Sequence, residues 1–279
     1  MSSTKHNLSN VKHVIAVAAG KGGVGKSTLT LNLALYFQMK GYRVGLMDAD
    51  LYGPSLKKML PEEVSPIQNP EERDRIVPAQ SRGIKLMSMA YFLTADNPTA
   101  VRAPIANGIV KQFVHLVDWQ ELDFLFIDFP PGTGDIQLTL IQEGLLSGAV
   151  MITTPQEVSL LDVSKSIMMF RQMQVPLIGL VENMSYYAIG GNQNQIYFPF
   201  GQGSAELFAL ENDLFFLGKV PIEEQICVCC DQGKSLFENG VNTPGTTAII
   251  SIAEKVQEQL EAFHVIKRDD LKMFDLRLQ

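Results

Sequence analysis

The sequence predicts one α/β domain with a doubly wound, mostly parallel central sheet covered by helices on both faces. Three observations support this prediction. Short apolar runs recur along the chain, and they are continuously apolar instead of alternating, which is typical of strands buried on both faces. Segments with a helical pattern lie between these runs, which gives the alternation of strand and helix found in such folds. The chain also lacks internal repeats and low-complexity tracts.

The predicted elements follow in chain order. Apolar runs predict buried strands at His13–Ala19, Tyr42–Asp50, Gly83–Met89, Leu122–Phe129, Gly148–Pro155, Val175–Asn183 and Leu214–Pro221. Helical patterns occupy Ser27–Met39, Leu161–Met173 and Gly245–Phe263. Two long stretches interrupt the alternation, and loops of this length are usually functional or mobile. The polar, Pro-rich Leu60–Gln80 is predicted to be a surface excursion, and the Gly/Asn/Gln-rich Tyr186–Gly203 a long loop or hairpin.

These patterns predict a flexible N-terminus over residues 1–10, one domain over residues 11–264 and a C-terminal tail over residues 265–279. A helical tail would place Leu271, Phe274 and Leu278 on one stripe. The charges of the tail nearly cancel, whereas a membrane-surface helix carries a basic excess. We therefore expect the tail to dock on the protein itself rather than on a membrane. His115, within "FVHLV", is expected to be an ordinary helix-surface or core histidine.

Composition excludes several classes of protein. The 279 residues are 46% apolar and 19% charged, with a net charge of −7, which is ordinary for a globular protein and argues against a nucleic-acid partner. No apolar run approaches the roughly 18 residues that span a bilayer, and the first residues lack the apolar core of a signal peptide. Three cysteines clustered in "QICVCCD" do not form a secreted disulfide framework. We expect a cytoplasmic protein without stable membrane insertion.

A phosphate-binding loop is predicted between the first strand and the first helix. The sequence "GKGGVGKS" matches the pattern G-x-x-x-x-G-K-[ST]. Its glycines allow backbone N–H groups to surround phosphate oxygens. The N-terminus of the following helix contributes the positive end of the helix dipole. Lys26 is expected to reach the β- and γ-phosphates of ATP, and Ser27 to ligate Mg²⁺. The predicted nucleotide contacts are Gly20, Lys21, Gly22, Gly23, Val24, Gly25, Lys26, Ser27 and Thr28.

Acidic residues end two of the predicted strands. In open α/β sheets ligands bind beyond the carboxyl ends of the strands. "MDAD" makes Asp50 the candidate that orients the attacking water, with Asp48 assisting at the metal. Asp128, at the end of "FLFID", is the candidate that holds the hydration shell of Mg²⁺. The alternative is that each aspartate only caps the end of its strand and has no role in binding or catalysis.

The second lysine of the loop resembles that of the deviant Walker A ATPases. In "GKGGVGKST" this residue is Lys21. The resemblance implies that Lys21 crosses a dimer interface and contacts the nucleotide of the partner subunit. The alternative is a solvated loop lysine.

The resemblance extends over nearly the whole chain, from about Val11 to Phe263. The sequences "MDADLYGPS", "DFLFIDFPPGTGDIQLTL" and "LVENMSYY" follow one another as in the Mrp/ApbC family, whose members are dimeric P-loop ATPases regarded as iron–sulfur cluster carriers. This resemblance implies a three-layer P-loop NTPase fold, slow ATP hydrolysis, a homodimer, and iron–sulfur assembly or client apoproteins as partners. It also implies that Asn183 reads the adenine edge and that Pro221 and the following loop close over the base.

The chain departs from this family at the cysteines. The family usually places C-x-x-C shortly after "ENMSY", where this chain has Ile189 and Asn192. Its own cysteines are Cys227, Cys229 and Cys230. Three interpretations are open: apolar filler, which we favour because free cysteine is often buried; a relocated metal or cluster site; or redox chemistry. For a cluster, Cys227 and Cys230 are the candidate ligands, because a helix would place them on one face.

Three functions remain open from the sequence. The first is a Mg-ATP-hydrolysing dimer that carries or assembles iron–sulfur clusters, the cluster being a possible further cofactor. The second is an ATPase switch of the division-site or partition type. The third is a cluster-free ATPase of the same family with an unknown protein partner.

Overall fold

The computed structural model describes residues 7–50, 53–92, 103–143, 145–188, 195–240 and 242–276, with the side chains of the last helix described to residue 263. In this part of the chain one eight-stranded sheet has the order β12-β9-β8-β1-β7-β2-β6-β5. All its strands run parallel except β5, which pairs antiparallel with β6 at one edge. The strands are β1 (Val11–Ala19), β2 (Val44–Asp48), β5 (Ala79–Ser81), β6 (Ile84–Ser88), β7 (Leu122–Asp128), β8 (Gly148–Thr153), β9 (Leu177–Glu182) and β12 (Phe216–Lys219).

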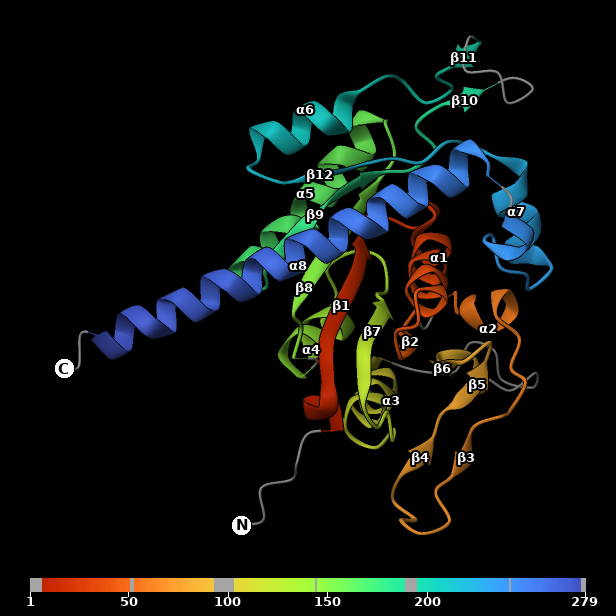
Figure 1. The fold of residues 1–279 in the computed structure, drawn as a ribbon, viewed down its shortest axis with the longest axis vertical. Helices are drawn as coiled ribbons and strands as arrows, with labels where there is room; N and C mark the ends of the chain where they lie inside the picture. Colours follow the sequence, from red (N-terminus) through yellow and green to blue (C-terminus); the bar gives the residue numbers. More distant parts are fainter. Residues whose placement is uncertain are drawn as a thin grey trace.

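Helices cover both faces of this sheet (Figure 1). One hydrophobic core joins the sheet to α1 (Lys26–Met39), α2 (Leu56–Met59), α7 (Glu224–Asp231) and α8 (Pro244–Leu276). A second core joins the opposite face to α3 (Ala103–His115), α4 (Asp135–Glu143), α5 (Glu157–Gln172) and α6 (Ser204–Glu211). Both faces of a strand are therefore buried, and this explains why the strands are continuously apolar. The three-layer α/β prediction is confirmed.

Strand β1 shows how the sequence produces the two cores. Successive side chains of a strand point to opposite faces of the sheet. Ile15 and Val17 accordingly belong to one core, while Val14 and Ala16 belong to the other. Every one of these positions must be apolar, which is the pattern that predicted a parallel sheet.

The two stretches that interrupt the alternation both contain short hairpins. Within the predicted surface excursion, β3 (Ile67–Gln68) pairs antiparallel with β4 (Ile76–Val77). In the second stretch, β10 (Tyr187–Ala188) pairs antiparallel with β11 (Ile196–Tyr197). Ile189 and Asn192, which stand where the family usually has its cysteines, lie outside the described residues.

A short helix and a long helix lie at the two ends of the described chain. Asn7–Asn10 form a 3-10 helix, η1, and Leu8 is buried in the second core. Helix α8 continues without a break past residue 265, and its far end extends beyond the sheet (Figure 1). Two more 3-10 helices, η2 (Met89–Tyr91) and η4 (Glu238–Gly240), lie between these ends. Leu271 and Phe274 fall within α8, but their side chains, and Leu278, are outside the described part. Within the described chain no helix is both long enough and apolar enough to cross a bilayer.

Candidate nucleotide-binding site

The loop between β1 and α1 has a backbone that requires glycine. Gly25 has φ 85° and precedes the first residue of α1, a left-handed conformation that glycine adopts readily. A Cβ on Gly25 would stand 2.1 Å from the Nδ2 atom of Asn183. A Cβ on Gly20 would stand 2.1 Å from the backbone carbon of Asp162 in α5. These glycines let the loop pack against two remote segments while Gly22 and Gly23 stay exposed.

Lys26 and Ser27 are held by one carboxylate. The Lys26 side chain is only 6% exposed, and its Nζ lies 2.7 Å from Asp128 Oδ1 and 3.7 Å from Asp50 Oδ2. Ser27 Oγ donates a hydrogen bond to Asp128 Oδ2 at 2.6 Å. Burial raises the pKa of Asp128, and the Lys26 ammonium opposes that effect. The two side chains that the motif assigns to phosphate and metal therefore converge on Asp128.

Asp48 lies beside Asp128 because the two residues are paired across β2 and β7. Its carboxylate accepts hydrogen bonds from Ser88 Oγ at 2.9 Å and from the Leu56 backbone N–H at 3.2 Å. Burial raises the pKa of Asp48 to about 7, and the nearby charge of Asp128 adds to this shift. Two buried acids and one buried lysine thus form a compact charged cluster at the carboxyl ends of the strands.

These groups suit Mg²⁺ that arrives with a nucleotide. Among the described residues, no group of three or more His, Cys, Asp or Glu side chains could hold a metal ion by itself. Protein-bound Mg²⁺ usually takes one or two carboxylates and completes its octahedron with phosphate oxygens and water. Ser27, Asp48 and Asp128 supply hard oxygen atoms of the required kind.

Two adjoining cavities lie over this cluster. The phosphate-side cavity, about 520 Å³, is lined by Asp50 and by every residue from Lys21 to Thr28 except Val24. The base-side cavity, about 320 Å³, is lined mainly by apolar side chains. Gly25, Thr28 and two methionines line both cavities. The combined shape provides one polar and one apolar compartment side by side.

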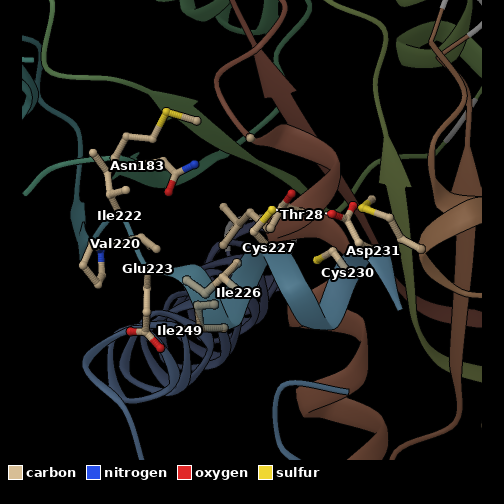
Figure 2. A pocket seen from close by; sticks show the side chains of 15 residues that line it. Thr28, Asn183, Val220, Ile222, Glu223, Ile226, Cys227, Cys230, Asp231 and Ile249 are labelled. Carbon is tan, nitrogen blue, oxygen red and sulfur yellow. Dashed lines mark hydrogen bonds between the residues drawn. The ribbon is translucent and has the colours of Figure 1, made fainter. Parts of the chain in front are cut away.

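Figure 2 shows the base-side cavity. Asn183 and Pro221, which the resemblance implied at the base, both line this cavity. Asn183 Nδ2 donates a hydrogen bond to the Val24 carbonyl at 2.8 Å, so its amide is tied to the phosphate loop. Glu223 Oε2 accepts a hydrogen bond from the Gly245 backbone N–H at 2.6 Å, while its Oε1 is buried without a hydrogen-bond partner. The remaining walls come from Leu29, Val220, Ile222, Ile226, Cys227, Cys230, Asp231 and Ile249.

The three cysteines of α7 have different environments. Cys229 and Cys230 are 5% and 6% exposed and belong to the core with Ile226 and Leu236, as apolar filler requires. Cys227 is exposed, which the filler interpretation did not anticipate. Asp231 raises the pKa of the Cys227 thiol, and burial raises that of Cys230 to about 11. Both shifts disfavour the thiolate that a metal or cluster requires.

Sequence reasoning missed several supporting residues. Thr30 Oγ1 donates a hydrogen bond to Asp128 Oδ1 at 3.1 Å, and its position four residues after Lys26 on α1 is a signal that could have found it. Ser88, which holds Asp48, lies on a different strand and has no local signal. The apolar residues of α7 and α8 that line the cavity also have no local sequence signal, because isoleucine is common in every core.

Comparison with known proteins finds relatives that are named as iron–sulfur cluster carrier or transfer proteins. The chain is 39% identical over 260 residues to an iron–sulfur cluster carrier protein of Aquifex aeolicus, which covers 93% of this chain and 71% of that protein. It is 38% identical over 271 residues to the iron–sulfur cluster transfer protein NUBPL of Dictyostelium discoideum, covering 96% of this chain and 82% of that protein.

Solved structures show the same similarity. A nucleotide-binding protein of Archaeoglobus fulgidus in complex with ADP matches with a TM-score of 0.70 and 33% identity, over 86% of this chain and 96% of that one. The septum site-determining protein MinD of Pyrococcus horikoshii, complexed with Mg-ADP, has a TM-score of 0.62 at 22% identity, over 88% and 95% of the two chains; this match shows the shared fold alone. The family model described as "ParA: NUBPL iron-transfer P-loop NTPase" matches residues 10–257. The chain therefore belongs to this family of P-loop NTPases, whose curated members include the iron–sulfur cluster carrier proteins.

Proposed function

We propose that this protein is a Mg²⁺-dependent ATPase that acts as a homodimer in the delivery or assembly of iron–sulfur clusters. The observation that carries the ATPase part is the convergence of Lys26 and Ser27 on Asp128, beside the apolar cavity that contains Asn183. Names of relatives such as the Aquifex aeolicus carrier support the iron–sulfur part.

In this proposal, ATP places its base in the base-side cavity and its phosphates in the loop from Gly20 to Thr28. Lys26 leaves Asp128 for the phosphate oxygens, where a fixed positive charge stabilises the transition state. Bound Mg²⁺ would be held by Ser27 and, through its water shell, by Asp48 and Asp128, and it would neutralise phosphate charge. Asp50, at the edge of the phosphate-side cavity, orients the water that attacks the γ-phosphate.

Lys21 is proposed to act across the dimer. It is half-buried and lines the phosphate-side cavity, and the alternative is a role within its own subunit. Mixing Lys21→Ala subunits with Asp50→Ala subunits tests this, since each mixed dimer would contain one site with both wild-type groups. Recovery of phosphate release in the mixture is expected. No recovery, with dimers confirmed by light scattering, would contradict the action in trans.

The cluster would be cargo, and Cys227 and Cys230 are the cysteines available for a pair. Both line the base-side cavity, so a cluster there would compete with the nucleotide. This observation favours an alternative function, a cluster-free ATPase of the same family that acts on a protein partner. Iron content and the visible absorption spectrum of protein purified without oxygen distinguish the two.

The ATPase part is tested separately, by Mg²⁺-dependent phosphate release. Stoichiometric iron with a charge-transfer band that a Cys227→Ser/Cys230→Ser double variant loses would establish cluster binding. ATP hydrolysis without iron would support the cluster-free candidate, and failure of both assays would contradict the whole proposal.

A further inference from the structure

Glu223 brings an unpaired hydrogen-bond acceptor to the wall of the base-side cavity. Its Oε2 accepts the hydrogen bond from the Gly245 backbone N–H, whereas its Oε1 is buried without a partner among the described residues. Buried polar groups in proteins are nearly always paired, because an unpaired acceptor is destabilising. An open acceptor in the wall of a cavity therefore indicates a ligand that brings its own donor.

The rest of the wall supplies no cation for Glu223. Among the described residues that line the cavity there is no lysine and no arginine. The Asn183 amide nitrogen donates to the Val24 carbonyl at 2.8 Å. The other acid of the wall, Asp231, accepts a hydrogen bond from the Cys227 thiol at 3.7 Å. The missing donor for Glu223 is thus expected to come from the ligand.

Glu223 lies at the end of the cavity that is remote from the phosphate loop. Gly25 and Thr28 line both cavities and mark the place where the two join, whereas Glu223 lines the base-side cavity alone. Figure 2 shows Glu223 and Thr28 on opposite sides of this cavity. A nucleotide with its phosphates in the loop would place its ribose near the junction and its base toward Glu223.

We propose that Glu223 selects the base of the nucleotide, with its Oε1 accepting a hydrogen bond from the exocyclic amine of adenine. This inference rests on the proposed function, because it assigns a specificity role within the same ATP site. Adenine has an amine donor at C6, whereas hypoxanthine and guanine have a carbonyl oxygen there. A 6-oxo base would bring a second acceptor to the carboxylate and leave Oε1 unpaired, and a site that loses a buried hydrogen bond in this way discriminates strongly.

The hydrogen bond from Gly245 fixes the orientation of the end group of this side chain. A backbone N–H only donates, so the atom that faces it must be an acceptor. In Glu223→Gln the amide oxygen therefore takes the position of Oε2, and the amide nitrogen takes the position of Oε1. The substitution keeps the size of the side chain and replaces an acceptor by a donor. The preference should consequently move from 6-amino toward 6-oxo bases.

The experiment measures binding of three nucleotides to the full chain by isothermal titration calorimetry with Mg²⁺. ATP has an amine at C6, ITP has a carbonyl oxygen, and purine riboside triphosphate has only hydrogen. The wild type should bind ATP about tenfold more tightly than either analogue, a difference of roughly 1.4 kcal/mol. In Glu223→Gln the preference for ATP over ITP should fall by about tenfold or more.

The matched control is Glu224→Gln. Glu224 is the exposed next residue and does not line the cavity. Its substitution removes the same charge, which changes the affinity of all three triphosphates together and leaves their ratios unchanged. Purine riboside triphosphate provides the reference for this general effect in Glu223→Gln. Thermal unfolding of both variants checks that they fold.

The outcomes separate this inference from the proposed function. Equal ATP-to-ITP ratios in the wild type and Glu223→Gln would overturn the inference and leave the ATPase proposal intact. A changed preference for ATP over 2′-deoxy-ATP, with the ATP-to-ITP ratio unchanged, would assign Glu223 to the ribose and also overturn it.

Two further results are decisive without the variant. Equal affinity of the wild type for ATP, ITP and purine riboside triphosphate would overturn the inference even if Glu223→Gln fails to fold. Absence of binding of any of these nucleotides to the wild type would overturn the proposed function and this inference with it.

Discussion

The two adjoining cavities are constructed in different ways. The phosphate side consists of backbone and charged groups at the carboxyl ends of β1 and β2, with Asp128 from β7 beneath them. The base side consists mostly of apolar side chains from α7, α8 and the segments after β9 and β12. Charges require fixed partners and therefore leave short, specific motifs in the sequence. An apolar wall requires only volume, so many residue combinations provide it, and its function is recognisable only from the folded structure.

Replacing Lys26 tests the charged side most severely. Lys26→Ala removes the positive charge proposed to stabilise the transition state and also leaves Asp128 buried without its cation. We expect the rate of ATP hydrolysis to fall by about 100-fold or more, measured as phosphate release under saturating Mg-ATP. Lys12→Ala, at an exposed position of β1, is the matched control. Wild-type turnover by Lys26→Ala would show that the site is assigned incorrectly.

The buried acid Asp48 gives the next largest expected effect, on stability. Its folded-state pKa of about 7 lies above the ordinary aspartate value of 3.8, so between these values the folded protein binds more protons than the unfolded chain. The free energy of unfolding of the nucleotide-free protein should therefore fall as pH rises through this window, by at most about 1.4 kcal/mol per pH unit for one group. Asp48→Asn should flatten this slope in urea unfolding between pH 4 and 7. An unchanged slope would exclude Asp48 as its source.

Asn183 links the two sides, because its amide bonds to the loop and lines the base-side cavity. Asn183→Ala should weaken ATP binding by about tenfold, the loss of roughly one buried hydrogen bond. It should also reduce the preference for ATP over GTP, measured by titration with fluorescent nucleotides. Asn212→Ala, at the end of α6, serves as the control. A variant that binds weakly but keeps its preference would assign Asn183 to loop structure and not to base recognition.

Asp123 gives the smallest expected effect and the opposite sign to Asp48. Hydrogen bonds from Arg43 lower the pKa of this surface carboxyl, so its contribution to stability is present above the unfolded pKa and is lost as pH falls. The Arg43 side chain is 56% exposed, and solvent screens such a pair, so its contribution to stability is small. In the same unfolding series, Asp123→Asn should slightly reduce stability near pH 6 and leave the slope from Asp48 in place. A flattened slope would show that surface charges cause the pH dependence.

The same contrast explains what could be predicted from sequence. The seven predicted strands lie within two residues of the observed bounds at each end, because burial on both faces requires continuous apolar runs. Lys26, Ser27, Asp48 and Asp128 come together because strand ends in a parallel sheet converge. The helix α7 has only eight residues, too short for a periodic pattern, so the sequence could not decide which cysteine faced the core. Its cysteines differ in exposure because Cys229 and Cys230 join the core on the side where α7 contacts α2, whereas Cys227 lies outside that core.

Glu223 connects the base-side cavity to the long helix α8. It precedes α7 and bonds to the backbone of Gly245 in the first turn of α8. Helix α8 has 33 residues, a length of about 50 Å at the usual rise per residue. A rotation of about 5° at its first turn would displace the other end by about 4 Å, simply from that length. Because α8 packs against β12, β9 and α1, the hydrogen bond from Gly245 to Glu223 links the wall of the base-side cavity to the helix layer over this face of the sheet.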